Sequence, residues 1–222
     1  MPHIVRILEV RQLTHDVKSF ITIKPKGFTY TSGQATSLSI NKPVLCEKKR
    51  PFTFASSPNS ENLEFIIKAY FDREGYTQEI HKLKVGDELI ISDPWGAISY
   101  KGKGVFIAGG AGITPFISIF RFLQEQNQLD GNTLFFSNKT SRDVILEEEL
   151  RGMFKEGFLN LILTRENNPQ YSFGHISKEY LRERIQDFSQ CFYICGPKSF
   201  VHDITGYLRE LGANWDELVF ER

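Results

Sequence analysis

Cysteine, methionine and tryptophan are scarce in this sequence, and neither sign of charge is in excess. Its 222 residues include 3 Cys, 2 Met and 2 Trp, and 27 basic residues balance 27 acidic ones. The cysteines, Cys46, Cys191 and Cys195, are too few for a disulfide framework or for an iron–sulfur cluster held by four cysteines, and their scarcity fits a reducing cytoplasm. The histidines show no metal-ligand spacing, so we expect no metal site.

The balanced charge and the lack of long apolar runs argue against a nucleic-acid-binding or a membrane protein. A net charge of zero gives no electrostatic reason to expect nucleic acid or an anionic membrane as a partner. No run approaches the roughly 20 apolar residues of a membrane helix. The N-terminal stretch MPHIVRILEVRQL alternates apolar and polar residues, which is typical of a strand and not of a signal peptide. We therefore expect a cytoplasmic protein.

The two halves of the sequence have different patterns. Residues 1–98 contain short segments rich in Val, Ile, Phe and Thr between turn residues, which predicts an antiparallel β-barrel domain with a short helix over 77–83. From Gly104 the pattern alternates, which predicts a doubly wound parallel-sheet domain over 103–222, after the polar stretch Ser99–Lys103. The expected strands there are 105–108, 133–136, 159–163, 192–195 and 218–220, and the expected helices are 115–126, 146–153, 178–185 and 198–211.

Three glycines follow the first strand of the second half, in the stretch GVFIAGGAGITPF. Gly109, Gly110 and Gly112 let the backbone approach a ligand closely and adopt conformations closed to other residues. The helix that follows presents free N–H groups and a positive dipole end, and Thr114 can cap it or donate to an oxygen. The turn therefore suits a phosphate or the pyrophosphate of a dinucleotide. The alternative is a tight strand-to-helix turn that binds nothing.

Polar residues end the next two strands of this half. The pattern is not Gly-x-Gly-x-x-Gly, and no acidic residue ends the second strand to hold a ribose hydroxyl. That strand runs into Ser137, Lys139 and Arg142, and the next one ends in Thr164–Arg165. Hydroxyls and cations at strand ends suit the extra 2′-phosphate of NADP, although an ordinary polar loop can have the same composition.

A second motif, RPFTFASSP, lies in the β-rich half. Arg50 offers a fixed fork of donors for a phosphate. Pro51 stiffens the segment, Phe52 gives an aromatic face, and Thr53 places a hydroxyl beside it. Taken alone, the motif is also compatible with a strand that has a charged edge and ends in a turn.

In this order and spacing, the two motifs resemble those of the ferredoxin–NADP reductase family of flavoproteins, and the resemblance extends over nearly the whole chain. Arg50–Thr53 match the family's Arg-x-Tyr-Ser/Thr flavin motif with Phe in place of Tyr, and Gly109–Pro115 match its pyrophosphate turn. The weaker matches are Ser32–Gly33–Gln34, Gly75–Tyr76–Thr77, Asp93–Pro94–Trp95–Gly96, Cys195–Gly196–Pro197 and the C-terminal aromatic Phe220.

The resemblance implies that the barrel binds FAD rather than FMN. It implies that Phe52 packs on the isoalloxazine ring, that Thr53 bonds near flavin N5, and that Arg50 and Thr77 contact the flavin phosphate. Because Phe52 replaces the family's usual Tyr, the hydroxyl contact to the ribityl chain is expected to be lost, whereas the stacking is kept. Further flavin contacts are implied for Pro51, for Gly75, and for the backbone of Ile66, Ile67 and Lys68.

The resemblance also implies a nicotinamide nucleotide in the second domain. Gly109, Gly110, Gly112 and Thr114 are expected to hold its pyrophosphate, and Cys195–Gly196–Pro197 to lie at the nicotinamide. Thr164–Arg165 match the family's Ser-Arg contact to the 2′-phosphate, which implies NADPH rather than NADH. Phe220 is expected to cover the second flavin face and Glu221 to assist proton handling. Cys195 and Phe220 are also compatible with plain core positions.

The implied activity is hydride transfer from NAD(P)H to FAD, with Thr53, Cys195 and Glu221 as candidate catalytic residues and electrons passed to a carrier. A basic stretch near the flavin motif, CEKKRPF, would attract an acidic carrier such as flavodoxin or ferredoxin. The alternatives are the reductase component of an oxygenase, a ferric or free-flavin reductase, and a non-catalytic flavin-binding electron-transfer or regulatory subunit.

Overall fold

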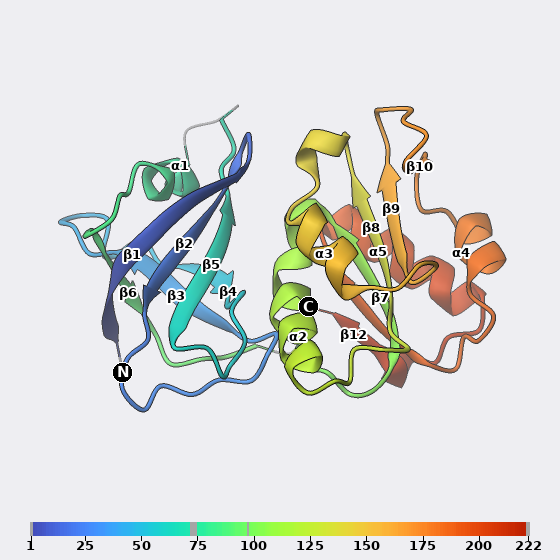
Figure 1. The fold of residues 1–222 in the computed structure, drawn as a ribbon, viewed down its shortest axis with the longest axis horizontal. Helices are drawn as coiled ribbons and strands as arrows, with labels where there is room; N and C mark the ends of the chain where they lie inside the picture. Colours follow the sequence, from blue (N-terminus) through green and yellow to red (C-terminus); the bar gives the residue numbers. More distant parts are fainter. Residues whose placement is uncertain (1, 72–74, 97, 221–222) are drawn as a thin grey trace. The chain divides into compact units, whose positions relative to one another are not determined.

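Two six-stranded sheets organise the chain, one antiparallel and one parallel (Figure 1). The computed structural model describes residues 2–71, 75–96 and 98–220. These residues group as two units, 1–96 with 114–122 and 97–113 with 123–222. The segment 114–122 therefore belongs with the first sheet, although it follows the first strand of the second sheet in the sequence.

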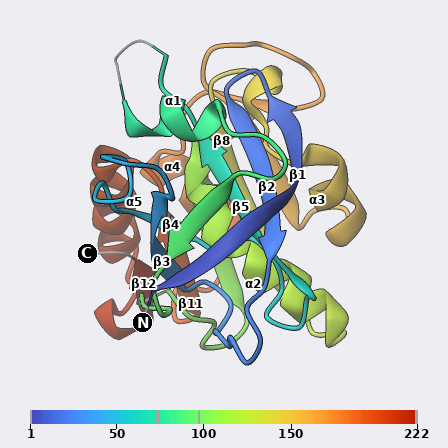
Figure 2. The same cartoon turned by 90° about the vertical axis from the view of Figure 1, so that its left-hand side faces the viewer.

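The first sheet has the strand order β4-β3-β6-β1-β2-β5 (Figure 2). Its strands are β1 (His3–Thr14), β2 (Val17–Ile23), β3 (Ala35–Ile40), β4 (Arg50–Thr53), β5 (Asn62–Lys68) and β6 (Glu88–Ile91), and the short helix α1 (Tyr76–His81) precedes β6. Just beyond β4, the Ala55 N–H donates to the Glu64 carbonyl of β5 at 2.8 Å. This bond links the two edge strands, so the antiparallel sheet curls back on itself.

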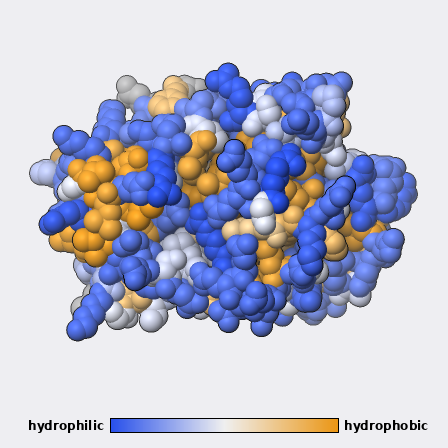
Figure 3. All heavy atoms as spheres, viewed as in Figure 1, coloured by the Kyte–Doolittle hydropathy of each residue, from blue (hydrophilic) through white to orange (hydrophobic). Residues whose placement is uncertain are grey.

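Strand β1 shows how the sequence pattern builds this sheet. Val5 and Ile7 are 1% and 0% exposed, whereas Ile4 and Leu8 are 61% and 42% exposed. Because successive side chains of a strand point to opposite faces, one face of β1 joins the core and the other stays on the surface. Figure 3 shows apolar side chains interspersed with hydrophilic ones on this unit.

An aromatic cluster in the core anchors the segment that follows β4. Phe54 is fully buried and stacks on Tyr30 with ring centroids 4.3 Å apart, and Phe28 lies edge-on to Phe54 at 5.8 Å. The Tyr30 hydroxyl lies 3.0 Å from the carbonyl oxygens of Ser56 and Ser57. Stacking and hydrogen bonding together therefore fix the backbone directly after Thr53.

The second sheet has the strand order β10-β9-β8-β7-β11-β12, and every pairing in it is parallel. Its strands are β7 (Gly104–Gly109), β8 (Thr133–Asn138), β9 (Leu159–Leu163), β10 (Ser172–Phe173), β11 (Cys191–Cys195) and β12 (Leu218–Phe220). The helices that connect them are α2 (Thr114–Glu125), α3 (Glu147–Met153), α4 (Lys178–Arg184) and α5 (Lys198–Glu210), with 3₁₀ turns η1 (Gly110–Ile113), η2 (Ser141–Asp143) and η3 (Trp215–Glu217).

The strand order of the second sheet reverses at β7, as in a doubly wound sheet. An antiparallel sheet followed by such a parallel sheet confirms the predicted fold class. The predicted strands and helices of this half begin and end within two residues of the observed ones. No helix in the described part of the chain has the length and apolar character needed to cross a bilayer.

Tyr193 fixes the start of the second unit. Its hydroxyl accepts hydrogen bonds from the Lys101 and Gly102 N–H groups at 2.9 and 3.0 Å, and it donates to the Gly102 carbonyl at 2.7 Å. The ring is fully buried and stacks on Phe106 with centroids 4.2 Å apart. Burial raises the pKa of Tyr193, so the hydroxyl keeps its proton for this bond.

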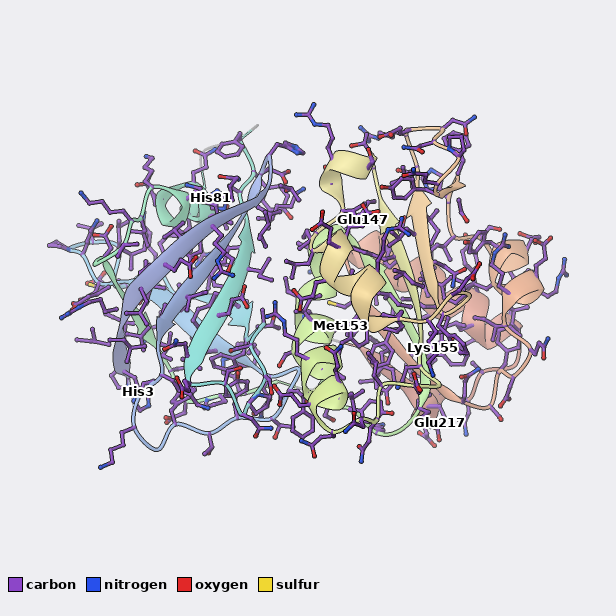
Figure 4. The ribbon with its side chains drawn as sticks, in the orientation of Figure 1. His3, His81, Glu147, Met153, Lys155 and Glu217 are labelled. Atoms are coloured by element: carbon purple, nitrogen blue, oxygen red, sulfur yellow. The ribbon has the colours of Figure 1, made fainter. Side chains whose placement is uncertain are left out.

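His81 is a buried titratable group at the end of α1 (Figure 4). The residue is 8% exposed, and its Nε2 donates to the Ile67 carbonyl at 2.7 Å. Its ring lies edge-on to Phe20 and Phe71, at 6.1 Å from each. Burial lowers the pKa of His81, because desolvation disfavours the imidazolium more than the hydrogen bond to Ile67 favours it.

Replacing His81 with Gln is expected to reduce the acid sensitivity of the fold. The folded-state pKa lies below the unfolded value of about 6.5, so the unfolded chain binds more protons and the free energy of unfolding falls as the pH drops below about 6.5. Urea denaturation at about pH 7.5 and about pH 5.5 measures that fall. The fall in the free energy of unfolding between the two pH values should be smaller in H81Q than in the wild type and in the control variant H15Q, whose histidine is exposed. An equal fall in all three proteins would contradict this account.

Candidate functional site

Strand β4 presents the flavin motif at the edge of the first sheet. It pairs with β3, so that Phe52 lies opposite Thr36 and Thr53 lies opposite Ala35. Arg50 is exposed, whereas Phe52 and Thr53 are half-buried, and the Phe52 ring packs against the core of the unit. With exposed Pro51 between them, a guanidinium, an aromatic ring and a hydroxyl therefore follow one another along one short edge strand.

Arg50 lies near the turn that begins α1. Its guanidinium carbon is 5.9 Å from the centroid of the Tyr76 ring. Gly75 caps α1 with an extended backbone, and Thr77 follows Tyr76 in the first turn. The Tyr76 hydroxyl accepts from the Ile40 N–H at 2.7 Å, which ties the helix to β3. Arg50 and the Gly75–Thr77 turn, both predicted to contact the flavin phosphate, thus lie close together in this unit.

The predicted backbone lining lies on β5. Ile66, Ile67 and Lys68 pair with residues of β2, and the two isoleucines are buried. The Lys68 ammonium is 2.6 Å from a carboxylate oxygen of Asp16. Burial of that carboxyl is the largest single effect and raises its pKa, but the bond to Lys68, the charge of Lys68 and the Thr14 hydroxyl together outweigh it, so the pKa of Asp16 is lowered overall. Because β5 is an edge strand, the ladder to β2 uses only one side of its backbone.

Thr53 and Thr114 are brought together within the first unit. The Thr53 hydroxyl donates to the Thr114 hydroxyl at 2.9 Å. Thr114 is the first residue of α2, and the chain enters it directly from the turn of three glycines. One hydrogen bond therefore links the flavin motif to the end of the helix that follows the predicted pyrophosphate turn.

In the second unit, the glycine turn lies against the end of β11. A Cβ on Gly112 would stand 2.3 Å from the Cys195 carbonyl oxygen, and one on Gly196 would stand 2.7 Å from the Phe200 ring. Gly109 is 3.3 Å from the same notional Cβ of Gly196. The predicted residues Gly109, Gly112, Cys195 and Gly196 are therefore in backbone contact, and Cys195 is half-buried beside them.

Two further predicted residues complete these turns. Gly110 adopts a left-handed conformation with φ of 52°, which favours glycine at that position. Pro197 caps the N-terminus of α5. Each turn after a strand thus leads into a helix whose first N–H groups have no partner in the preceding turn of the same helix.

Thr164 and Arg165 directly follow β9 and bond to residues at the end of β8. The Thr164 N–H and hydroxyl both donate to the Asn138 carbonyl, at 2.9 and 3.2 Å, and the Arg165 N–H donates to the Lys139 carbonyl at 2.8 Å. The side chains of Lys139, Arg142 and Arg165 are exposed. Three cations therefore gather on two cross-linked loops at the carboxyl edge of the parallel sheet.

An acidic residue that the sequence pattern did not single out lies in the same loops. The Glu166 carboxylate accepts hydrogen bonds from the Ser141 N–H at 2.8 Å and from the Ser141 hydroxyl at 3.0 Å. The backbone bond from Ser141, followed by the Asn168 side chain, lowers the pKa of Glu166. Its charge is thus held in place beside the three cations.

Phe220 ends β12, opposite Ile194 of β11. Its ring lies edge-on to Trp215 at 5.7 Å and packs against the core of the second unit. This packing agrees with the alternative of an edge-strand core residue, and the predicted role as a flavin cover stays a prediction. Glu221, the predicted proton carrier, lies outside the described residues.

The residues present fit an anionic dinucleotide. The turns around Gly112 and Gly196 leave no room for a Cβ, so the backbone is bare at these two positions. The side-chain amide of Asn138 is 4% exposed, and neither its nitrogen nor its oxygen has a hydrogen-bond partner among the described residues. Buried polar groups are normally bonded, so Asn138, at the end of β8, has capacity for a bond beyond those in the protein.

Sequence reasoning missed two residues of α2 that contact the flavin-motif segment. Ser118 donates to the Ser56 carbonyl at 2.7 Å, and Arg121 donates to the Ala55 carbonyl at 2.9 Å. A signal was present, because Ser118 and Arg121 interrupt an otherwise apolar helix four and seven residues after Thr114. That spacing places all three side chains on one helix face.

Two family models match almost all of the chain. The first is the FAD-binding domain, over residues 3–99, and the second is the oxidoreductase NAD-binding domain, over residues 106–205. Together with the fold, these matches show that the chain belongs to the FAD- and NAD(P)-binding flavoprotein oxidoreductases of the ferredoxin–NADP reductase-like family.

Individual relatives carry different names. NADH-cytochrome b5 reductase 2-A of Vanderwaltozyma polyspora is 27% identical and aligns with 96% of this chain and 81% of its own length. The reductase component of Rhodococcus jostii propane 2-monooxygenase is 24% identical and aligns with 98% of this chain and 62% of its own. A ferredoxin NADP+ reductase structure from Neisseria gonorrhoeae, with bound FAD and NADP, shares the fold with a TM-score of 0.87 at 20% identity, over 99% of this chain and 98% of its own.

Replacing Gly112 with Ala is expected to destabilise the fold by about 1–3 kcal/mol, because the new methyl group overlaps the Cys195 carbonyl. The two turns must move apart, so binding of a nicotinamide nucleotide should weaken as well. Thermal unfolding and equilibrium titration with the nucleotide measure the two effects. A Gly206→Ala variant in α5 is the control, since beyond the adjacent backbone of its own helix no atom of the described residues lies within 4 Å of its added Cβ. Equal stability and equal nucleotide affinity of the two variants would contradict the close packing of Gly112 against the Cys195 carbonyl.

Proposed function

We propose that this chain is an NAD(P)H-dependent reductase that holds FAD at the first unit and transfers electrons from the nicotinamide nucleotide to a separate acceptor. The hydrogen bond from Thr53 to Thr114 is the observation that carries this proposal. It joins a residue of the flavin motif to the first residue of the helix that follows the glycine turn. A protein that only stores flavin has no need for that link.

FAD, when bound, supplies an acceptor for hydride and a carrier that can release electrons singly or in pairs. The protein supplies position and charge. In this proposal Phe52 and Pro51 lie along the ring and Thr53 orients it. Arg50 neutralises its phosphate, Thr77 adds a hydroxyl there, and the edge of β5 from Ile66 to Lys68 lines the flavin. Arg50 suits this role because its guanidinium is exposed and presents a fork of donors.

The nicotinamide nucleotide is proposed to lie along the carboxyl edge of the parallel sheet. Gly109, Gly110 and Gly112 with Thr114 would hold its pyrophosphate by backbone N–H groups and a hydroxyl. Cys195 and Gly196 would lie at the nicotinamide, where a small, polarizable side chain leaves room for the ring. Phe220 would cover the flavin in the absence of nucleotide, and Glu221 would handle protons.

We further propose a preference for NADPH over NADH. Lys139, Arg142 and Arg165 are exposed at one edge of the sheet, beside the Thr164 hydroxyl, and a 2′-phosphate adds charge that these cations attract. The relative from Vanderwaltozyma polyspora is named an NADH enzyme, and Glu166 adds a negative charge to the same loops. These two observations favour NADH, so a comparison of the two nucleotides is the direct test of the preference.

The acceptor is proposed to be an acidic carrier protein such as a flavodoxin or ferredoxin. The loop before β4 carries Lys42, Lys48 and Lys49 on its exposed surface with Glu47 as its acidic residue, and complementary charge steers association. A second candidate acceptor is favoured by the names of the relatives, which include cytochrome b5 reductases and the reductase component of an oxygenase. In that case the partner is a small haem protein or an oxygenase component.

Stopped-flow reduction of the bound flavin by each nucleotide tests the activity and the preference together. Arg165→Ala is expected to lower kcat/KM for NADPH about tenfold to a hundredfold, the effect of one charge-assisted hydrogen bond worth about 1.5–3 kcal/mol. The value for NADH should change little.

The matched control is Lys155→Ala, which also removes one exposed cation but lies just before β9, at the opposite end of that strand. Faster reduction by NADH in the wild type, with equal effects of Arg165→Ala on both nucleotides, would refute the NADPH preference. Absence of reduction by either nucleotide in flavin-loaded protein would refute the reductase activity and favour a non-catalytic flavin-binding subunit.

A further inference from the structure

Helix α2 carries a polar stripe on an otherwise apolar surface. Its sequence, TPFISIFRFLQE, contains six large apolar residues, and those at 116, 117, 119, 120 and 123 are at most 1% exposed. Thr114, Ser118 and Arg121 are spaced by four and three residues, so they lie on one face of the helix. Ser118 is itself fully buried. The stripe therefore faces mainly protein, with Thr114 and Arg121 half-buried.

Each member of the stripe bonds to the same short segment, Thr53–Ser56. Thr114 accepts from the Thr53 hydroxyl at 2.9 Å, Ser118 donates to the Ser56 carbonyl at 2.7 Å, and Arg121 donates to the Ala55 carbonyl at 2.9 Å. The three bonds span about 10 Å along the helix axis at 1.5 Å per residue. A turn of α2 by one residue, about 100°, would break all three at once.

The far end of the stripe is held by an ion pair that is largely shielded from water. Arg121 pairs with Glu64 of β5, and the two side chains are 21% and 13% exposed. The other oxygen of that carboxylate accepts from the Ser19 hydroxyl at 2.5 Å, and the Glu64 N–H donates to the Ser56 hydroxyl at 3.0 Å. Strands β2 and β5, the Thr53–Ser56 segment and α2 therefore form one bonded network.

Such a pair is a weak source of stability. Removing two charges from water costs several kcal/mol per ion, and apolar residues of similar volume often stabilise a fold as well or better. The geometry of a buried pair specifies an arrangement, because only one register of α2 satisfies both Glu64 and the Ala55 carbonyl. The network is thus suited to fixing a position.

We propose that Ser118 and Arg121 are positioning residues for hydride transfer, which fix the Thr114 end of α2 against Thr53 by bonding α2 to the Thr53–Ser56 segment. This inference rests on the proposed reductase function and assigns it two residues for which no cofactor contact is proposed. Reaction between two held groups depends steeply on their geometry, and a misplacement of about 1 Å can lower a rate about a hundredfold. Loss of the stripe should therefore affect the transfer step more than either binding step.

The test compares Arg121→Met, Arg121→Lys and Ser118→Ala with the wild type. Arg121→Met removes the bonds to the Ala55 carbonyl and to Glu64, whereas Arg121→Lys keeps the charge opposite Glu64. The control is Arg151→Met in α3, which breaks an ion pair with Glu147 on the surface of the second unit. Three quantities are measured: the rate constant of flavin reduction at saturating nucleotide, the Kd of the nucleotide, and the charge-transfer absorbance when oxidised nucleotide is added to the reduced protein.

For Arg121→Met we expect a rate constant about tenfold or more below that of the wild type, a Kd within about threefold, and loss of the charge-transfer absorbance. Ser118→Ala should show a smaller loss of the same kind. Arg121→Lys should recover most of the rate, and Arg151→Met should match the wild type.

Because Arg121→Met leaves Glu64 without its counter-charge and could unfold the protein, Glu64→Gln/Arg121→Met serves as the second variant, with no unpaired charge. If it folds and transfers hydride slowly, the proposal holds. Wild-type rates and charge-transfer absorbance in this double variant, or a loss explained entirely by Kd, would overturn it. These outcomes differ from failure of the proposed function, in which the wild-type flavin itself is not reduced.

Discussion

The close approach of two backbone turns in the second unit is the constraint on which the candidate site depends. Gly112 lies so near the Cys195 carbonyl that a methyl group would overlap it, and a Cβ on Gly196 would stand 2.7 Å from the Phe200 ring. This contact occurs where the strand order reverses, between β7 and β11, which is the place where doubly wound sheets bind ligands. Glycine at these positions lets the turn after β7 lie directly against the end of β11, within the second unit.

A net charge of zero conceals a patterned surface. Lys139, Arg142 and Arg165 gather at the carboxyl edge of the parallel sheet, and the loop before β4 carries three further lysines. Acidic residues are used differently, since Asp16, Glu64 and Glu166 are bound to named partners inside their own units. Balanced composition therefore excludes a uniformly basic protein but gives no information about local fields, which depend on which carboxylates are already paired.

Much of the fold could be predicted from the sequence, because the spacing of apolar residues indicates which faces are buried and turn residues mark where strands and helices end. Alternation in β1, apolar runs in β7 and β8, and glycines after β7 identified the two sheets, and motif order identified the family. The rest depends on contacts between distant residues. Periodicity shows that α2 is buried, but not that residues 114–122 pack with the first sheet. Likewise, the sequence shows Glu166 only as an acidic loop residue, because its partner Ser141 lies 25 positions earlier. Phe220 reads equally well as a cofactor cover or a core residue, and its packing on Trp215 does not decide between the two.

The membership of residues 114–122 has a consequence for how this chain can be divided. The two sheets follow one another in the sequence, which suggests a cut at the polar stretch before β7. The first unit, however, includes a helix encoded after that stretch, and this helix supplies the partners of Ser56, Ala55 and Glu64. A fragment that ends at the stretch lacks these partners and leaves the carboxylate of Glu64 without its counter-ion. The two units are therefore not exchangeable modules, and a recombinant chimera must inherit the barrel and this helix from the same parent.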